Sequence, residues 1–382
     1  MVNAQMEAEQ AVLGAILLAP RQLRLLSAWL RPAHFYRPAH AALYEALLAQ
    51  QEAGHRALAS DRAEDQLAWV TQATAATTAA SPGFTAAYGH TLIAACPVPA
   101  HAASYGRMVL ETAVRREVHE RAHRLHAAAR TGDIDATLHL TRDLRAAISR
   151  LVDAWGSVDE RPRPAPGPWP LELAERTVEE TRRYEQALLG ALTAVPGELA
   201  EITTWLHPAD FLDPGHRAVY QALAALGRRG DAIDPLTVLW EVQHRGALAG
   251  GDITADAVRA LTRTGFTGDP GYWAEKVLRA RALRSATGSA GAVRLLSLDA
   301  SVPAARLLGF ALHTLRETGA VHKRWRTVTG GAEPEAGEPE PERRRGAARA
   351  RTLVPVPDTG AAAPPSPAQQ AASPRAPVRS MH

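Results

Sequence analysis

Apolar residues near the start of the chain recur three and four positions apart, the spacing that places them on one face of a helix. A second amphipathic stretch follows after short segments that end at prolines. No segment alternates apolar and polar residues in the manner of a half-buried strand. We therefore predict an all-α fold. The apolar stripe of the first helix, and its repeat later in the chain, are Val12, Leu13, Ile16 and Leu17, and Leu188, Leu189 and Leu192.

One part of the sequence occurs twice. Residues 9–47 align without gaps to residues 185–223 at an offset of 176, with 19 identities in 39 positions. The identities include glycine, proline and aromatic residues as well as the apolar stripe. A gap-free match across three expected helical elements indicates a duplicated folded unit.

Prolines and capping residues mark the ends of the helices within each copy. The residue before Pro32 or Pro208 is driven out of the helical region, so a short second helix ends there. Asp213 before Pro214 has the signature of the next helix start, because a carboxylate accepts free amide hydrogens and proline has none to satisfy. Copy two has another such start at Asp234-Pro235, which copy one lacks.

Each copy ends in two long helical stretches separated by a short turn, which is typical of an antiparallel helical hairpin. Gly132 lies in the first turn, and Pro303 lies early in the last helix. The four expected helices span about 100–131 and 133–153 in copy one, and about 270–298 and 302–320 in copy two.

The segments outside the copies differ in composition. Between the copies, prolines at every second position favour an extended, semi-rigid spacer. After copy two the chain is rich in Pro, Ala, Gly and charge, which predicts disorder. The expected organisation is two globular bundles that each carry a hairpin, a linker and a tail, at residues 1–155 (copy one), 156–175 (linker), 176–326 (copy two) and 327–382 (tail).

Composition excludes several classes of protein. Hydrophobic residues make up 46% of the 382 residues and charged residues 22%, which is ordinary for a globular chain. The longest apolar run, residues 11–20, is far short of the ~20 residues of a membrane span, and no basic segment precedes it as in a signal peptide. The single Cys96 cannot form an internal disulfide. We expect a cytoplasmic protein without a membrane span; association with the nucleoid is a variant of that expectation.

The near absence of lysine decides one question of function. Of the 43 basic residues only Lys276 and Lys323 are lysines. A P-loop needs Gly-x-x-x-x-Gly-Lys-Ser/Thr, because backbone amides wrap the phosphates while the lysine contacts the β and γ oxygens. Neither lysine follows a glycine turn. We therefore predict that the chain is not an enzyme, and we expect neither a cofactor nor a metal ion.

The repeated sequence resembles the N-terminal domain of DnaB-type replicative helicases. The resemblance rests on residues 7–18, 32–40 and 44–47 in copy one, and on residues 208–211, 214–216 and 230–238 in copy two. It implies that each copy is an all-helical globule followed by a helical hairpin, in agreement with the periodicity.

The sequence departs from that family in one respect. A second copy of the N-terminal domain stands where the RecA-like ATPase domain would follow, so motor activity is not carried over. In the family, the hairpins pair to form dimers that build a ring collar, and the domain helps to contact primase. The resemblance therefore implies an intramolecular pseudo-dimer, with a homo-oligomer as the alternative. The expected protein partner is a replicative helicase, its primase or a loader.

The positions that carry the family motif recur in both copies, and we interpret them as structural. A glycine on a helix face permits close packing, and a histidine that opens a helix beside proline is more often a packing or capping residue than a ligand. These positions are Glu9, Gln10, Gly14, Pro32, Phe35, Pro38, His40 and Tyr44, and Glu185, Gln186, Gly190, Pro208, Phe211, Pro214, His216 and Tyr220.

The hairpins carry further polar residues, for which we favour an exposed, solvated face. His119, His123 and His126 share one helical face but lack a further ligand for a metal. Several arginines of the hairpins offer contacts to an acidic partner or to nucleic-acid phosphate as the alternative. They are Arg115, Arg116, Arg121 and Arg124, and Arg279, Arg281 and Arg284.

The tail supplies a second hypothesis about function. Arg343, Arg344 and Arg345 follow a glutamate-rich run and offer phosphate contacts for weak nonspecific DNA binding through counterion release. The alternative is that the preceding glutamates neutralise these arginines. We therefore expect a non-catalytic protein-interaction and oligomerisation module linked to DNA replication. The alternative is a DNA-associated accessory protein that binds phosphate through its tail and hairpins.

Overall fold

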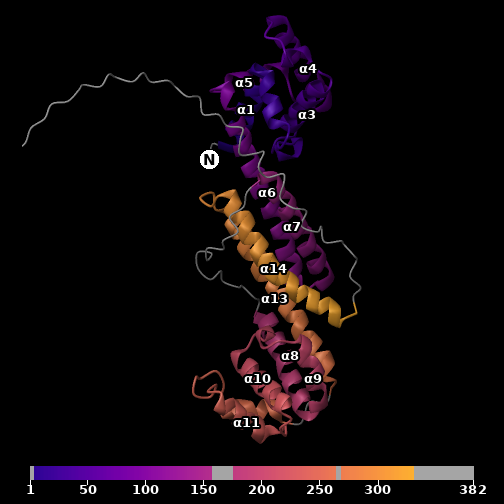
Figure 1. Cartoon of the computed structure of the whole chain (residues 1–382), viewed down its shortest axis with the longest axis vertical. Coiled ribbons are helices and arrows are strands. Elements are labelled where there is room, and N and C mark those ends of the chain that lie inside the picture. The colour runs from indigo at the N-terminus through magenta and orange to yellow at the C-terminus, as the bar shows by residue number, and fades with distance from the viewer. Residues whose placement is uncertain (1–3, 157–174, 264–267, 331–382) are drawn as a thin grey trace, which may run out of the picture. The chain divides into compact units, whose positions relative to one another are not determined.

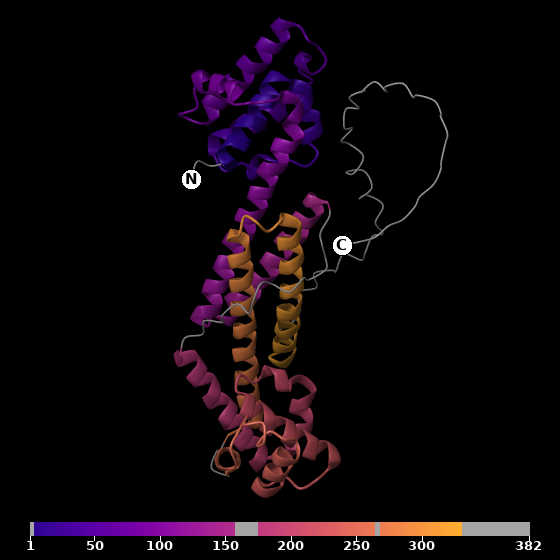
Figure 2. The same cartoon turned by 90° about the vertical axis from the view of Figure 1, so that its left-hand side faces the viewer.

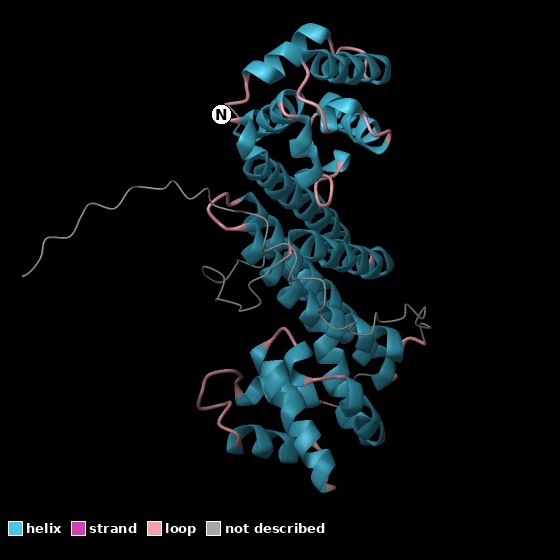
Figure 3. Ribbon diagram, turned by 45° about the horizontal axis from the view of Figure 1, so that its top comes forward, coloured by secondary structure: helices cyan, strands magenta, loops and turns pink. Residues whose placement is uncertain are grey.

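The computed structural model describes residues 4–156, 175–263 and 268–330, and within them every regular element is helical (Figures 1 and 3). All of the described residues belong to one compact unit. The described part therefore confirms the predicted all-α fold. Most of the proline-rich linker, and the tail with Arg343, Arg344 and Arg345, lie outside the described residues.

Copy one begins with a globule of five α-helices around a buried apolar core. The first helix is apolar on nearly every side because it lies at the centre of this core, and Val12, Leu13 and Ile16 are fully buried. Some of the connections between helices are single 3-10 turns that begin at proline, such as Pro32–His34. The five helices are α1 (Ala4–Leu18), α2 (Leu23–Leu26), α3 (Pro38–Glu52), α4 (Ala63–Ala80) and α5 (Ala86–Ala94).

Copy two repeats this plan with shorter peripheral helices. Asp213 accepts hydrogen bonds from the amides of Gly215 and His216, and Asp234 caps the following helix through the amides of Leu236 and Thr237. Both capped starts were predicted from the sequence. The helices of this globule are α8 (Glu175–Ala194), α9 (Leu199–Trp205), α10 (Pro214–Arg229), α11 (Pro235–His244) and α12 (Ala255–Thr262).

Each globule continues into a long helical hairpin, as the sequence predicted. Gly132 links the helices of the first hairpin with a φ of 80°, a left-handed conformation that glycine adopts without steric cost. The hairpins consist of α6 (Ala102–Thr131) with α7 (Ile134–Trp155), and α13 (Pro270–Leu298) with α14 (Ala304–Val328).

The last helix is longer than the sequence predicted. Its predicted end was near residue 320, and the tail was expected from residue 327, whereas α14 continues to Val328. The added turns bury Val321 and His322, and Trp325 packs against the core of copy two. These contacts with the globule, which local sequence does not report, stabilise the extra turns.

The two hairpins pack against each other (Figure 2). Residues of α13 and α14 belong to the same buried apolar cluster as α6 and α7. The α13 residues in this cluster recur every three or four positions, and α14 adds a parallel stripe. These residues are Ala286, Ala290, Val293 and Leu296 of α13, and Ala304, Leu307, Leu308, Ala311 and Leu315 of α14.

None of the helices within the described ranges has the length and apolar character that crossing a lipid bilayer would require.

The residues of α6, α7, α13 and α14 in this cluster form an apolar seam between the two hairpins. The seam predicts the effect of shortening one buried side chain of copy two. Leu307 is fully buried in the cluster that also contains the core of copy one. Leu307→Ala should lower the free energy of unfolding by about 2–5 kcal/mol, because it removes buried methyl groups and leaves a cavity. Urea unfolding measures this change. Leu298→Ala, at a side chain that is 62% exposed, is the control and should change stability by less than about 0.5 kcal/mol. Equal effects of the two variants would contradict the seam.

Candidate functional site

Glu9 and His40 form a fully buried polar pair in copy one. Glu9 Oε2 lies 2.7 Å from His40 Nδ1, and Glu9 Oε1 accepts a hydrogen bond of 2.7 Å from the backbone amide of Tyr36. Burial alone would raise the pKa of Glu9, but the bonds from His40 and from the Tyr36 amide outweigh it and lower the pKa. The carboxylate therefore ties α1 to the turn that opens α3.

Copy two repeats this arrangement bond for bond at the offset of 176. Glu185 Oε2 lies 2.8 Å from His216 Nδ1, and the carboxylate accepts from the amides of Leu212 and Asp213. Neither carboxylate is exposed to solvent. We call this arrangement the Glu–His clasp, formed by Glu9 with His40 and by Glu185 with His216.

An aromatic pair lies beside each clasp. The rings of Phe35 and Tyr44 have centroids 5.1 Å apart, and those of Phe211 and Tyr220 are 4.7 Å apart. Tyr44 donates its hydroxyl hydrogen to the backbone carbonyl of Leu30, and Tyr220 donates to that of the equivalent Leu206. Burial raises the pKa of both tyrosines, so both stay neutral.

The remaining motif positions shape the backbone. Pro32, Pro38, Pro208 and Pro214 each occupy the first turn of a helical element.

Gly14 allows α5 to approach α1, since a Cβ at this position would overlap the carbonyl oxygen of Leu92. Gly190 is buried at the equivalent place in α8. Gln10 donates to the hydroxyl of Tyr88, and Gln186 is half-buried.

The sequence alone did not reveal that the glutamate and the histidine pair with each other. The sequence places Glu9 and His40 31 residues apart, on different helices, and shows no contact between them. One signal was available: Glu and His recur at the same offset, each beside proline or apolar residues that predict burial. A buried carboxylate requires a partner, and histidine was the candidate that recurs with it.

Two arginines repeat a second contact. Arg116 of α6 donates to the carbonyl oxygen of His34 at 3.3 Å, and Arg284 of α13 donates to that of Asp210 at 2.6 Å. Both carbonyls close the 3-10 turn of their globule. Arg116 and Arg284 lie 168 residues apart in the sequence. At the same offset Val109 of α6 corresponds to Val277 of α13, so the two arginines occupy equivalent positions of the two hairpins. In both copies an arginine therefore ties the hairpin to its globule.

Two other arginines join the copies to each other. Arg115 of α6 donates to the carbonyl oxygens of Asp299 (2.9 Å) and Val302 in the turn of the second hairpin. Arg279 of α13 donates to the carbonyl oxygen of Gly132 in the turn of the first hairpin, at 2.5 Å. Each hairpin thus holds the tip of the other.

The favoured interpretation of the hairpin arginines as an exposed charged face is therefore wrong for most of them. Arg284 is buried, and Arg115, Arg116, Arg121, Arg279 and Arg281 are half-buried, whereas Arg124 is exposed. The reason is that the face expected to meet solvent packs against the other copy or against its own globule.

Of the three histidines of α6, His119 follows the same pattern. His119 Nδ1 lies 3.0 Å from the hydroxyl of Ser297 on α13, so this face meets the second hairpin rather than solvent alone. His119 and His123 stack with centroids 6.3 Å apart, and His123 is exposed. In the described ranges no three His, Cys, Asp or Glu side chains converge as metal ligands would.

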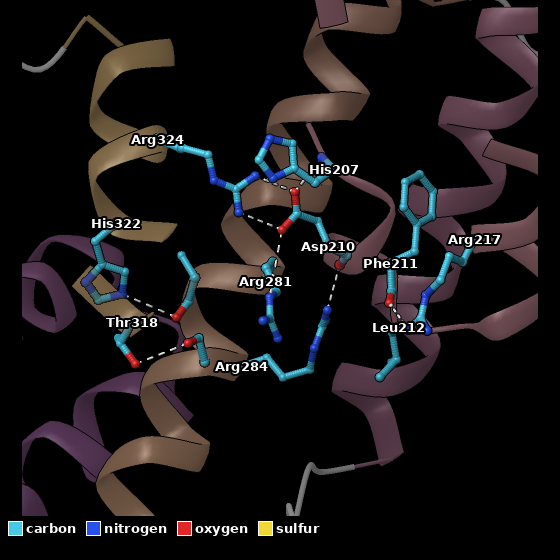
Figure 4. A network of polar contacts seen from close by, with 12 residues as sticks. His207, Asp210, Phe211, Leu212, Arg217, Arg281, Arg284, Thr318, His322 and Arg324 are labelled. Carbon is cyan, nitrogen blue, oxygen red and sulfur yellow. Dashed lines mark hydrogen bonds and ion pairs between the residues drawn. The ribbon is translucent and has the colours of Figure 1, made fainter. Parts of the chain in front are cut away.

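Copy two contains an ionic network that joins its globule to both helices of its hairpin (Figure 4). The buried carboxylate of Asp210 accepts two hydrogen bonds from Arg324 of α14, at 2.7 and 2.8 Å, and one of 2.7 Å from the amide of His207. Arg281 of α13 lies 3.8 Å away. Two cations and an amide thus surround one carboxylate.

Copy one has His34 where copy two has Asp210. Its Nδ1 accepts from the amide of Arg31 at 3.1 Å, and burial lowers its pKa, so this ring is neutral. Copy one therefore closes the same turn without an ion pair. Instead, Arg107 stacks over Trp29 and Trp155, which brings the globule and the end of α7 together.

His322 lies beside the Asp210 network, between α13 and α14 (Figure 4). Its Nε2 donates to the carbonyl oxygen of Ala282 at 3.3 Å. Burial lowers the pKa of His322 to about 4. The ring is therefore neutral at physiological pH, and charging it opposes the packing of the hairpin.

Comparison with known proteins identifies one family. The model of the DnaB-like helicase N-terminal domain matches residues 1–111 and 178–269, which together make more than half of the chain. The chain is similar to the replicative DNA helicase DnaC of Bacillus subtilis (34% identity over 76 residues) and to the replicative DNA helicase DnaB of Mycobacterium leprae (36% over 64 residues).

These alignments are short. They cover 20% and 17% of this chain, and 17% and 11% of the respective relatives. No solved structure matches the chain.

The Glu–His clasp predicts a charge-dependent loss of stability. Glu9→Gln should lower the free energy of unfolding by about 1–3 kcal/mol, because the amide cannot satisfy both His40 and the turn amides. Chemical unfolding at pH 7 measures this loss. The difference should shrink as the pH falls through the lowered pKa of Glu9, because the wild-type carboxylate then becomes neutral as well. Glu7→Gln, on the exposed side of α1, is the control; an equal loss there would contradict the prediction.

His322 predicts a loss of stability on mild acidification. Its pKa is about 4 in the folded chain and about 6.5 when unfolded. As the pH falls from 6.5 towards 4, the unfolded chain binds a proton that the folded chain excludes, so stability falls by up to about 1.4 kcal/mol per pH unit. His322→Gln keeps a donor for Ala282 and should flatten this slope between pH 6.5 and 4.5. His313→Gln, at a half-exposed ring of the same helix, should keep the wild-type slope. Identical slopes for all three proteins would refute the assignment.

Proposed function

Because the chain belongs to the family of the DnaB-like helicase N-terminal domain, and matches it twice, we propose that it is a non-catalytic interaction module of DNA replication. The proposal places it in the cytoplasm. Its partner is a replicative helicase, a primase or a loader, and the matched relatives are themselves named replicative helicases.

One observation carries this proposal: the two hairpins pair within a single chain. They share one apolar cluster, and Arg115 and Arg279 each hold the tip of the opposite hairpin. In the family that the sequence resembles, hairpin pairing joins separate subunits of a collar. A chain that pairs its own hairpins stands in for two such subunits and leaves its globules to contact a partner.

The hydrogen bonds of the motif residues support a non-catalytic role. The buried glutamates and histidines bond to each other and to turn amides, so they are not available to take a proton from a substrate. The motif thus maintains the shape of each globule. We propose that the chain acts through that shape rather than through chemistry.

The globule of copy two presents an apolar surface for such a contact. Leu236 and Trp240 lie one turn apart on α11 and are 74% and 67% exposed. Exposed tryptophan is unusual in a soluble domain and is enriched among residues that dominate protein interfaces. We assign this pair, the α11 patch, as a contact for the replication partner.

The experiment uses purified protein and the purified replicative helicase of the same cell. The full chain should run as a monomer of 40.9 kDa in light scattering and should bind the helicase after nuclease treatment. Trp240→Ala should weaken binding by at least about tenfold, a loss of about 1.4 kcal/mol. Leu298→Ala, at an exposed side chain at the end of α13, should not.

Two results would contradict the proposal. One is helicase binding that disappears with nuclease or on deletion of residues 331–382, which would favour the alternative of a DNA-associated protein. The other is the absence of binding to helicase, primase and loader alike.

A further inference from the structure

A cavity of about 220 Å³ lies where the tip of the first hairpin meets copy two. Its walls come from three segments that are distant in sequence: residues 129–132 at the end of α6, residues 177–184 of α8 and residues 276–287 of α13. Its volume is far above the ~10–15 Å³ needed for one water. Because residues of both copies line it, a single copy could not form it.

The charges around this cavity are strongly unbalanced. Four cationic side chains line it, Arg130, Lys276, Arg279 and Arg284, against one carboxylate, Glu180. Glu180 is bonded to the hydroxyl of Tyr184. Burial raises the pKa of Tyr184 to about 12, so the phenol contributes no negative charge at neutral pH.

Arg284 is the most deeply buried of the four, with 8% of its surface exposed. It donates to the backbone carbonyl of Asp210, but the carboxylate of Asp210 is taken by Arg324. The other acid that acts on it, Glu185, is held by His216. Burial, followed by repulsion from Arg281, lowers the pKa of Arg284 to about 10, so its guanidinium group still carries a positive charge at neutral pH.

The other cations also contact neutral groups. Arg279 donates to the carbonyl oxygen of Gly132, and Lys276 Nζ lies 5.1 Å from the ring centroid of Tyr272. Within the described ranges none of the four forms an ion pair. Arg284 is buried, Lys276 and Arg279 are half-buried, and Arg130 is exposed. Because these four cations face a cavity that holds one carboxylate, an anion that enters the cavity stabilises them.

We propose that this cavity binds the phosphoryl group of a small phosphorylated molecule, and that the bound anion fastens the tip of the first hairpin to copy two. Guanidinium groups bind phosphate oxygens through paired, charge-assisted hydrogen bonds. Walls from three helices favour the end of a small molecule over the middle of a nucleic-acid strand. The proposal does not depend on the proposed function, because it concerns the pairing of the copies and not the partner of the globules.

Isothermal titration calorimetry of the full chain with inorganic phosphate and with diphosphate, in chloride buffer, tests the proposal. We expect one site per chain, tighter binding of diphosphate, and a rise in Tm on binding because the anion prefers the folded state. Lys276→Gln should weaken binding by at least about tenfold. Among the described residues its ammonium group contacts the ring of Tyr272 and forms no ion pair, so this variant should fold normally. Arg124→Gln removes an exposed charge from α6, away from the cavity, and should bind as the wild type does.

Three outcomes would overturn the proposal. The first is the absence of binding heat and of a Tm shift with either anion. The second is equal affinity in the wild type and in Lys276→Gln. The third is displacement of diphosphate by a short single-stranded oligonucleotide at equal phosphate concentration, which would assign the site to nucleic acid instead. None of them depends on whether the helicase binds, so failure here is distinguishable from failure of the proposed function.

Discussion

The apolar seam between the two hairpins is the constraint on which the rest of the structure depends. A long hairpin with an apolar stripe is stable only when that stripe is covered, and each hairpin here covers the other. The seam also brings Arg115 and Arg279 within reach of the opposite tips. The cavity at the first tip exists because the seam places residues 129–132 beside α8 and α13.

The buried clasps explain which residues stayed the same after duplication. Removing either member of a buried pair leaves an uncompensated charge or unsatisfied amides, which costs several kcal/mol. The clasp, the tyrosine bond and the arginine bond to the turn therefore occur in both copies. By contrast, the turn residue itself differs between the copies. His34 accepts a hydrogen bond from the amide of Arg31 in copy one, whereas Asp210 accepts hydrogen bonds from Arg324 in copy two.

The sequence predicted the helices, the capped starts at Asp213 and Asp234, and the turn at Gly132, because these depend on local periodicity and capping. It did not predict that Glu9 pairs with His40, or that Arg115 reaches the second hairpin. Those contacts join residues that only tertiary packing brings together. The same limit explains the end of α14, where packing of Trp325 on the globule extends the helix beyond its local signals.

Pairing of α6 with α13 has a consequence for synthesis on the ribosome. The first hairpin emerges complete at Trp155, but its partner helix α13 does not end until Leu298. At roughly 5–20 residues per second, synthesis of these 143 residues takes about 7–29 seconds, and during that time the apolar stripe of α6 lacks its cover. During that interval a nascent chain on a neighbouring ribosome of the same messenger could supply the missing hairpin. The order of the helices in the chain therefore leaves the apolar stripe of α6 without its partner helix until copy two has been synthesised.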